Sequence, residues 1–416
     1  MTPDISARSP SRGFLVAPGR SSPLIRDRVR ALLLILAAIT CGWTAWSGYP
    51  LALPVAMTFP LLWARAPSRL TAAALSAGYF LATSRGLPQG VANFYTADLW
   101  PGLLLWLAAS LCFVLAHAAL WSGQPEKGRE QWKGPARYLL VLVLMGLPPF
   151  GIVGWAHPLT AAGILFPGWG WWGVIVATAG LLAMTTRLWP AALTILTGFW
   201  LWSAATWTEP SLAGGWKGVD LKLGETLGRD TSFDRHRVLI ATVRSHARDG
   251  TRFVVLPESA LGFWTPTVAR LWQEGLRGSG MIVIAGAVVI DTQGYDNVLV
   301  AVSEDGARIF YRERMPVPVS MWQPWLRWTG EGGGAHADFF VNPVVGLDGM
   351  RIAPLICYEQ LILWPVLQSM LHRPEIIVAA GNGWWTKGTS IVAIQKASVI
   401  AWARLFGVPV VTAFNT

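Results

Sequence analysis

The sequence is poor in charged residues and in cysteine. Only 13% of its 416 residues are Asp, Glu, Lys or Arg, whereas an ordinary globular domain carries about 25%. Its three cysteines, Cys41, Cys112 and Cys357, lie far apart and include no CxxC pair, which excludes a disulfide framework and a cysteine-rich zinc site. The six histidines include no HExxH pattern, so we expect no metal. We predict no cofactor either.

Hydrophobic residues make up 53% of the chain, and they gather in its first half. Residues 1–30 are basic and rich in Ser, Pro and Gly, so we predict a disordered cytoplasmic tail. Seven apolar segments follow, at residues 31–47, 50–64, 70–84, 99–121, 138–155, 163–185 and 188–207. Because about 20 apolar residues span a bilayer, residues 31–207 are predicted to be a membrane domain with about seven transmembrane helices. The second and third segments are short and could instead form one re-entrant hairpin.

The positive charge of the chain lies mainly in this apolar half. Residues 1–207 hold 14 Lys and Arg against 5 Asp and Glu, whereas the rest holds 19 against 18. The predicted loops alternate in charge: Arg65, Arg69, Arg187 and the basic segment 127–137 occupy the even loops, and only Arg85 lies in an odd one. Because positive loops stay in the cytoplasm, we predict a multi-pass protein of the bacterial inner membrane with a cytoplasmic N-terminus and a periplasmic C-terminal domain.

Two classes of function are disfavoured by the same charges. The polar half has no cluster of cations, so direct nucleic-acid binding is not predicted. The apolar segments have no interior acidic residue, which disfavours a transporter.

Residues 215–416 have a different pattern, in which short β-branched runs alternate with amphipathic stretches. The runs predict strands at 253–256, 281–289, 297–302, 308–311, 351–356, 376–379 and 408–412. Helices are predicted at 234–248, 265–275, 361–371 and 390–406. Segments 286–302 and 297–311 are typical of β-hairpins. This alternation predicts a layered α/β domain.

Three of these strands end in residues that can do chemistry. Glu258 follows the first strand, Cys357 and Glu359 follow the strand at 351–356, and Asn382 and Trp384 follow the strand at 376–379. Ligands of open α/β sheets bind at the carboxyl ends of strands, where a thiol and a carboxylate could be a nucleophile and its general base. Taken singly, such a cysteine is more often a buried small side chain, and such a glutamate is more often solvated.

Together, Leu-Pro-Glu at 256–258, Ile-Cys-Tyr-Glu at 356–359 and Asn-Gly-Trp-Trp at 382–385 resemble motifs of the nitrilase, or carbon–nitrogen hydrolase, superfamily. With the preceding apolar segments, the chain is similar to apolipoprotein N-acyltransferase and to acyltransferase-like proteins of conjugal plasmid transfer. The resemblance covers roughly residues 31–416 and implies a polytopic helical membrane half followed by a nitrilase-like αββα sandwich at 215–416. It also implies that Glu258 is the general base, Cys357 the nucleophile and Glu359 a supporting carboxylate, with Asn382 and Trp384 beside them.

The chain departs from this family at the catalytic lysine. The family motif Tyr-x-Lys-x-x-Leu-Val-Pro-Phe-Gly-Glu corresponds to residues 311–321, where Glu313 holds the lysine position and Met321 replaces the last glutamate. Loss of one oxyanion donor typically costs about 2.7–4 kcal/mol, and a carboxylate near Cys357 should raise the pKa of the thiol. Arg312 or Arg314 could replace the lysine only if a bulge turned one of them to the other face of the strand.

The C-terminus is the second departure, because the family continues beyond the position of Thr416. We therefore expect a C-terminally shortened sandwich with an exposed sheet edge.

Two functions remain open. In the first, Cys357 takes an acyl group from a membrane lipid as a thioester and passes it to an amine of an acylated or peptide partner. In the second, favoured by Glu313, a catalytically degenerate domain serves as a binding or assembly factor for the conjugation machinery. Hydrolysis of a soluble amide or nitrile is less expected, since a soluble substrate needs no membrane half.

Overall fold

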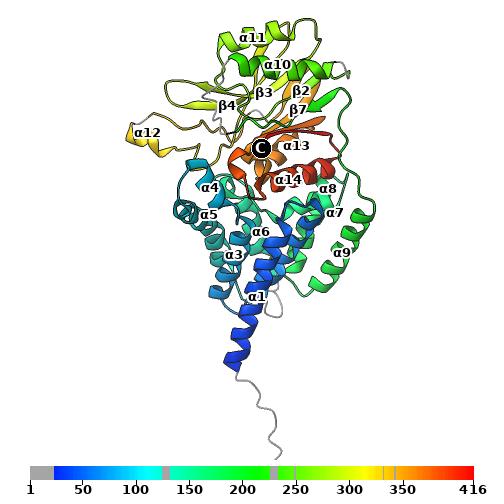
Figure 1. Ribbon diagram of the computed structural model, residues 1–416. Coiled ribbons are helices and arrows are strands. Elements are labelled where there is room, and N and C mark those ends of the chain that lie inside the picture. The colour runs from blue at the N-terminus through cyan, green and yellow to red at the C-terminus, as the bar shows by residue number, and fades with distance from the viewer. Residues whose placement is uncertain (1–22, 124–131, 225–232, 248–249, 331, 342) are drawn as a thin grey trace, which may run out of the picture.

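The computed structural model describes residues 23–123, 132–224, 233–247, 250–330, 332–341 and 343–416. Most of the tail predicted at residues 1–30, and the basic residues 127 and 129, lie outside these ranges. Figure 1 shows a helical half formed by the first part of the chain and an α/β half formed by the second.

The helical half follows the predicted apolar segments only in part. It contains α1 (Pro23–Ala45), η1 (Pro50–Thr58), α2 (Phe59–Ala64), α3 (Arg69–Thr83), α4 (Leu87–Tyr95), α5 (Leu99–Leu120), α6 (Lys133–Gly146), η3 (Phe150–Val153), η4 (Pro158–Ala161), α7 (Ala162–Leu165), α8 (Trp171–Met184) and α9 (Trp189–Ala205). Two of the described helices are long and apolar enough to cross a bilayer, Ile25–Ala45 and Leu99–Leu120. Seven transmembrane helices are therefore not confirmed by helix length.

Prolines and glycines explain the shorter elements. Pro54 lies inside η1. Because proline has no backbone N–H, it cannot donate a helical hydrogen bond at this position. The segment predicted at 138–155 ends its α-helix at Gly146, and the one predicted at 163–185 is interrupted between α7 and α8. Helix α4 was not predicted, because its sequence has no long apolar run.

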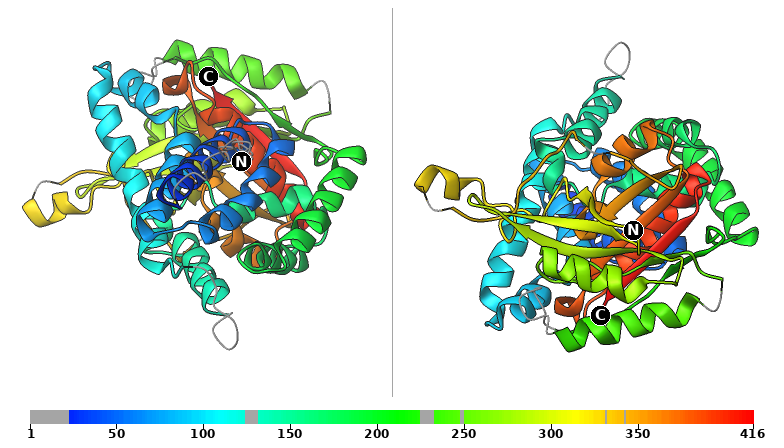
Figure 2. Two further views of the ribbon diagram at one scale, coloured as in Figure 1. Left: turned by 90° about the horizontal axis from the view of Figure 1, so that it is seen from below. Right: turned by 90° about the horizontal axis from the view of Figure 1, so that it is seen from above.

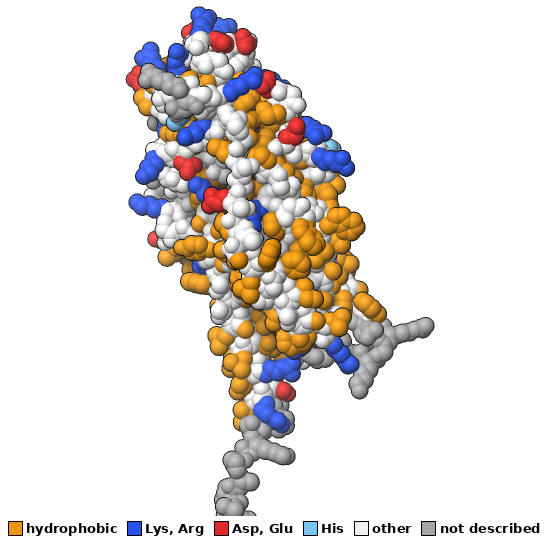
Figure 3. All heavy atoms as spheres, turned by 90° about the vertical axis from the view of Figure 1, so that its right-hand side faces the viewer, with side chains coloured by type: hydrophobic (Ala, Val, Ile, Leu, Met, Phe, Trp, Pro, Cys, Tyr) orange, Lys and Arg blue, Asp and Glu red, His pale blue; other side chains and the backbone are white. Residues whose placement is uncertain are grey.

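The helical half nevertheless exposes much apolar surface. Figure 3 shows hydrophobic side chains spread over one face of this half, with most charged side chains above or below them. Leu36 of α1 and Leu104 of α5 are both 58% exposed. Other exposed side chains on α1, α5, α8 and α9 are Leu32, Leu33, Leu107, Leu111, Leu115, Trp172, Ile175, Ile195, Leu201 and Trp202.

Arginines gather at the end of the helical half that lies away from the α/β half. Arg30 donates to the Arg65 carbonyl at 3.1 Å, and the Arg65 guanidinium lies over the Trp189 ring at 4.9 Å. Arg69 donates to the carbonyl of Trp121 at 3.4 Å. The starts of α1, α3 and α9 and the ends of α2 and α5 therefore meet at one basic end.

The α/β half consists of two sheets. The first contains β1 (Trp216–Gly218), β2 (Phe253–Val255), β3 (Ile282–Ile290), β4 (Tyr295–Val302) and β5 (Ala307–Arg312), in that order. The second contains β6 (Val345–Leu347), β7 (Met350–Ile356), β8 (Ile376–Asn382) and β9 (Val410–Asn415), also in that order. Strands β3, β4 and β5 form the two predicted hairpins, whereas β7, β8 and β9 are parallel.

Alternate residues of the strands build the layers. Ile352 and Ile356 of β7 point into the core between the two sheets, while Ala353 and Leu355 face the other side, as the period of two requires. Helices α10 (Phe233–Ala247) and α11 (Pro266–Leu276) cover the first sheet, and α13 (Leu363–Leu371) and α14 (Ile391–Phe406) cover the second. The result is the predicted αββα sandwich, whose layers lie one above another in Figure 1 and are seen from below and from above in Figure 2.

The two halves share one core. Buried residues of α13 and α14 belong to the same hydrophobic cluster as those of α1, α3 and α7. Gly163 of α7 permits this close approach, because a Cβ there would overlap the Ala401 carbonyl of α14. The second sheet therefore packs against the helical half through α14, which lies between them (Figure 1).

The sequence predicted an exposed sheet edge, but the outer edge of β9 is covered by another segment of the chain. Leu221 donates its N–H to the Phe414 carbonyl at 2.8 Å, and Thr416 donates to the Leu221 carbonyl at 3.0 Å. The expectation was wrong because the segment after β1 crosses over to pair with the last strand.

Candidate active site

The predicted site residues meet at the carboxyl ends of β2, β7 and β8. Glu258 follows β2, Cys357 begins the turn η5 (Cys357–Gln360), and Asn382 ends β8. Cys357 has φ +44°, a left-handed conformation that costs a non-glycine residue energy and is typical of functional sites. Gly286 of β3 lies beneath Glu258, where any side chain would overlap the Glu258 backbone.

The Cys357 thiol and the Glu258 carboxyl group line the same cavity and lie close enough for each to shift the pKa of the other. Both side chains are buried, and the backbone N–H of Asn382 interacts with each of them. Gln395 of α14 donates to the Cys357 carbonyl at 3.0 Å and approaches the sulfur at 3.7 Å. Cys357 and Glu258 are thus positioned by strands of both sheets and by α14.

The protonation equilibria fit these roles. Burial raises the pKa of Glu258 to about 7, against the opposing hydrogen bonds from Cys357 and Asn297. Burial, and then the neighbouring carboxyl groups of Glu258 and Glu313, raise the pKa of the Cys357 thiol well above its usual range. The resting pair is therefore a neutral thiol beside a carboxyl group that ionises near neutral pH, as a general base requires.

Glu359 lies in a separate, fully hydrogen-bonded cluster. Its carboxylate accepts from the Tyr311 hydroxyl at 2.8 and 2.9 Å and from the backbone N–H groups of Arg314 and Ile356, both at 2.8 Å. The guanidinium Nε of Arg314 lies 3.6 Å from Glu359. Burial raises the pKa of Glu359, and the Arg314 charge opposes that rise.

Arg314, a candidate supporting residue that could replace the lysine only through a bulge, points to α13 instead of to the thiol. Its Nη1 donates to Gln368 at 2.7 Å, and its Nη2 donates to Ser369 at 3.1 Å. Arg312 pairs with Asp296 on the partly exposed face of β5. Neither arginine takes the place of the family lysine, because each is held by other partners.

Glu313 occupies the interior beside Glu258. The Asn297 amide nitrogen donates to Glu258 at 2.7 Å and to Glu313 at 3.1 Å. Asn297 was not predicted as a site residue, although it begins an otherwise apolar strand segment, which is the sequence signal that could have identified it. Gln395 gave no such signal, because it lies in an ordinary amphipathic helix.

A cavity of about 960 Å³ connects this site with the helical half. Its polar lining includes Glu258, Asn297, Cys357 and Asn382. Its apolar lining comes from α4, α5 and the strand ends, and includes Leu87, Val91, Phe94, Tyr95, Leu105, Phe263, Val288, Trp384 and Trp385. Trp384 stacks on Phe94 with ring centroids 5.7 Å apart.

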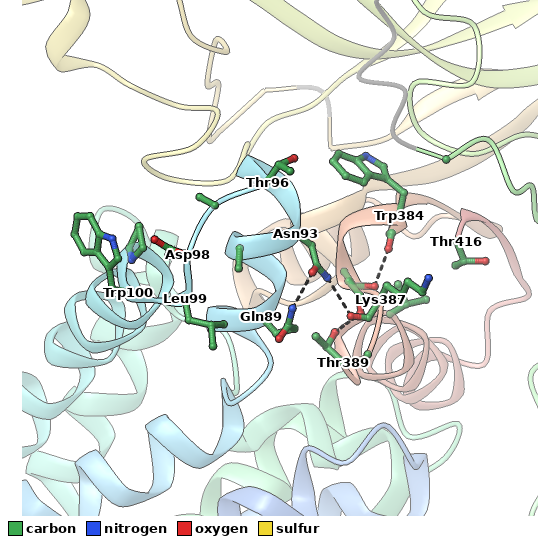
Figure 4. Close-up of a pocket in the computed structure, with 18 of the residues that line it drawn as sticks. Gln89, Asn93, Thr96, Asp98, Leu99, Trp100, Trp384, Lys387, Thr389 and Thr416 are labelled. Atoms are coloured by element: carbon green, nitrogen blue, oxygen red, sulfur yellow. Dashed lines mark hydrogen bonds between the residues drawn. The ribbon is translucent and has the colours of Figure 1, made fainter.

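A wider groove of about 1700 Å³ lies on the other side of Trp384 (Figure 4). Asn93 of α4 donates to the carbonyls of Trp385 and Lys387 at 2.9 and 3.0 Å, and accepts from Gln89 at 2.8 Å. These bonds fix α4 to the turn that follows β8. Cys357 and Glu258 do not line this groove.

Comparison with known proteins agrees with this geometry. Residues 81–404 match the carbon–nitrogen hydrolase family. The conjugal transfer protein TraB of Agrobacterium fabrum is 68% identical over 421 residues, with 100% of both chains covered. The chain belongs to the TraB proteins of the carbon–nitrogen hydrolase family. A probable conjugal transfer protein TraB of Sinorhizobium fredii is 63% identical, covering 94% of this chain and 100% of that protein.

The family confirms the nitrilase-like fold predicted from the three motifs. Solved structures of a Nesterenkonia amidase of the nitrilase superfamily are similar to this chain over 48% of its length, one of them with 12% identity and a TM-score of 0.35, covering 74% of the amidase.

Proposed function

We propose that this protein is a membrane-embedded acyltransferase of conjugal transfer that works through a thioester on Cys357. The observation that carries this proposal is the cavity in which Cys357 and Glu258 face apolar side chains of α4 and α5. A lipid chain held among Val91, Phe94 and Leu105 would place its ester near the thiol. A soluble substrate would gain nothing from these contacts.

The reaction needs only groups that line the cavity. Glu258 takes the thiol proton as the Cys357 sulfur bonds to the acyl carbonyl carbon, and the backbone N–H of Asn382 is placed to stabilise the oxyanion. The ester C–O bond breaks, and the leaving alcohol receives the proton from Glu258. An amine then attacks the thioester and gives a proton to Glu258. The C–S bond breaks, and the thiolate takes that proton back.

The helical half would lie in the bilayer. Its exposed leucines and tryptophans have no partner in the described part of the chain that buries them, and exposed apolar surface of this extent is typical of lipid contact. The basic end formed by Arg30, Arg65 and Arg69 would lie at the cytoplasmic face. The α/β half, at the opposite end, would then be periplasmic.

Reporter fusions at residues 128 and 216 test this topology. We expect a cytoplasmic signal at the first position and a periplasmic signal at the second. Equal signals from both fusions would contradict the proposed orientation.

Trapping of the acyl-enzyme tests the chemistry. Membranes containing the protein are incubated with a phospholipid that carries a tagged acyl chain. The measured quantity is the tag that becomes bound to the protein and is released by hydroxylamine, which cleaves thioesters. We expect label on the wild type and on Cys112→Ala, and none on Cys357→Ala. Cys112 is the matched control because it is an exposed cysteine on α5.

A second candidate is a binding or assembly role without catalysis. It is favoured by Glu313 in the lysine position and by the raised pKa of the Cys357 thiol. Under this hypothesis the wild type carries no label, whereas Glu313→Lys, which restores a cation, gains one. Label on the wild type would reject it.

A further inference from the structure

We propose that Glu313 is a neutral carboxylic acid that positions Asn297, and that the Asn297 amide thereby takes over part of the task of the missing lysine. The inference rests on the proposed thioester chemistry. It makes Glu313 a positioning residue of the site instead of a defect in it.

The geometry is that of one amide between two carboxyl groups. The Asn297 nitrogen has two hydrogens, and its contacts to Glu258 and Glu313 use both of them, at 2.7 and 3.1 Å. The Asn297 carbonyl oxygen and the second carboxyl oxygens of both Glu258 and Glu313 have no hydrogen-bond partner among the described residues. Asn297 lines the cavity together with Glu258 and Cys357, whereas Glu313 does not.

Two buried carboxylates so close together cannot both carry a charge without compensation. The nearby cations are engaged elsewhere, Arg312 with Asp296 and Arg314 with Gln368 and Ser369. Burial and the Glu258 charge raise the pKa of Glu313 well above its usual range. Of the two groups, Glu258 lines the cavity with the thiol and interacts with the backbone N–H of Asn382, whereas Glu313 does not line it, so we assign the single negative charge to Glu258.

This arrangement explains how the site works without an ammonium group. A lysine at this position would serve as the oxyanion donor and would also lie beside Glu258, and the Asn297 amide takes over only the donation to Glu258. Glu313 accepts the second amide hydrogen and so fixes the orientation of the amide. Its own proton stays in place throughout the reaction, because Glu258 carries the transferred proton.

Infrared difference spectroscopy and thioester trapping on the full-length protein test the inference. The spectrum of the wild type minus Glu313→Gln should contain the carbonyl band of a protonated carboxylic acid at pH 7. Glu274→Gln, at an exposed glutamate of α11, controls for the loss of a carboxyl group. Glu313→Gln should form the thioester at close to the wild-type rate, whereas Glu313→Ala should be slower by about tenfold or more, because Asn297 loses its partner.

The outcomes separate the two proposals. If the acid band is absent, or if Glu313→Gln is as slow as Glu313→Ala, the role of Glu313 is overturned even when the wild type forms a thioester. If the band is present but no variant is labelled, the proposed acyl transfer fails, and with it the positioning role, while the neutral state of Glu313 stands.

Discussion

Two groups of buried carboxyls lie near Cys357, and they are compensated very differently. Glu359 accepts hydrogen bonds from Tyr311 and from backbone amides, and the Arg314 guanidinium lies 3.6 Å away. Glu258 and Glu313 share one neutral amide, that of Asn297. The oxygens of Glu359 accept hydrogen bonds from backbone N–H groups and from a buried hydroxyl, and these donors stabilise its negative charge. In the second group, the donors to Glu258 are neutral, and with a pKa of about 7 this carboxyl group can gain and lose a proton near neutral pH.

This difference separates a carboxylate that stabilises the fold, Glu359, from one that is available for catalysis, Glu258. Glu359 is only two residues from Cys357 in sequence, yet its donors tie β5, η5 and α13 together. Glu258 is remote in sequence, yet it lines the same cavity as the Cys357 thiol. A buried charge with complete partners strengthens the fold, whereas an incompletely compensated one is available for catalysis.

The largest expected effect is on acylation, from Glu258→Gln. Removal of a general base typically costs about 10²–10⁴-fold in rate, so thioester formation should fall by that factor. The free energy of unfolding should not fall above pH 7, because ionising this buried carboxyl costs folding energy as the pH rises through about 7. Labelling kinetics and thermal unfolding in detergent measure the two quantities. If Glu258→Gln instead lowered the free energy of unfolding and left labelling unchanged, Glu258 would be a structural carboxylate like Glu359.

The next largest effect is on stability, from Arg314→Met. The variant leaves the buried Glu359 carboxylate without its cation, and breaking such a pair typically costs about 3–5 kcal/mol. Thermal or denaturant unfolding should show a loss of this size. A loss below about 1 kcal/mol would indicate that the backbone donors alone compensate Glu359.

The sequence predicts most of the α/β half because its signals are local. Alternating apolar residues and β-branched runs predicted seven of the strands within a few residues of their ends. Strands β1 and β6 have three residues each and carry too short a pattern to be recognised. The breaks in the apolar segments lie at prolines and glycines, such as Pro54 and Gly146, and helix α4 has no long apolar run, so hydropathy alone identifies neither.

The site was predictable where a motif carried it. Glu258, Cys357 and Glu359 stand in short recognisable motifs, whereas the position of Asn297 between two carboxyls depends on the pairing of β4 with its neighbours. The direction of Arg314 could not be predicted, because β5 ends at Arg312 and the strand alternation no longer applies. The charge state of Glu313 follows from these tertiary contacts, so the sequence alone indicated only a harmful carboxylate.

A moderate effect is expected from pH. Since the pKa of Glu258 is about 7, the carboxyl is mostly protonated below that pH and cannot accept the thiol proton. The rate of thioester formation should therefore rise with pH through about 7, with about a tenfold loss for each unit below it. Rates measured from pH 5.5 to 8.5 test this, and Arg314→Met, if folded, should keep the same midpoint. A rate independent of pH over that range would exclude Glu258 as the base.

The smallest effect is expected from Arg312→Met, which is the matched control for Arg314→Met. Both arginines belong to one segment and each is near a carboxylate, but the side chain of Arg312 is 38% exposed and that of Arg314 is fully buried. Exposed ion pairs contribute about 0–1 kcal/mol because water and salt screen them and ordering the side chains costs entropy. Arg312→Met should therefore lower the free energy of unfolding by no more than that, and added salt should shrink the effect further. Acylation should be unchanged, since Arg312 is held by Asp296 and not by Glu258 or Glu313. If Arg312→Met instead slows labelling as much as Glu258→Gln does, Arg312 supports the Cys357 thiol. The conclusion that Glu258 and Glu313 share only a neutral donor would then be wrong.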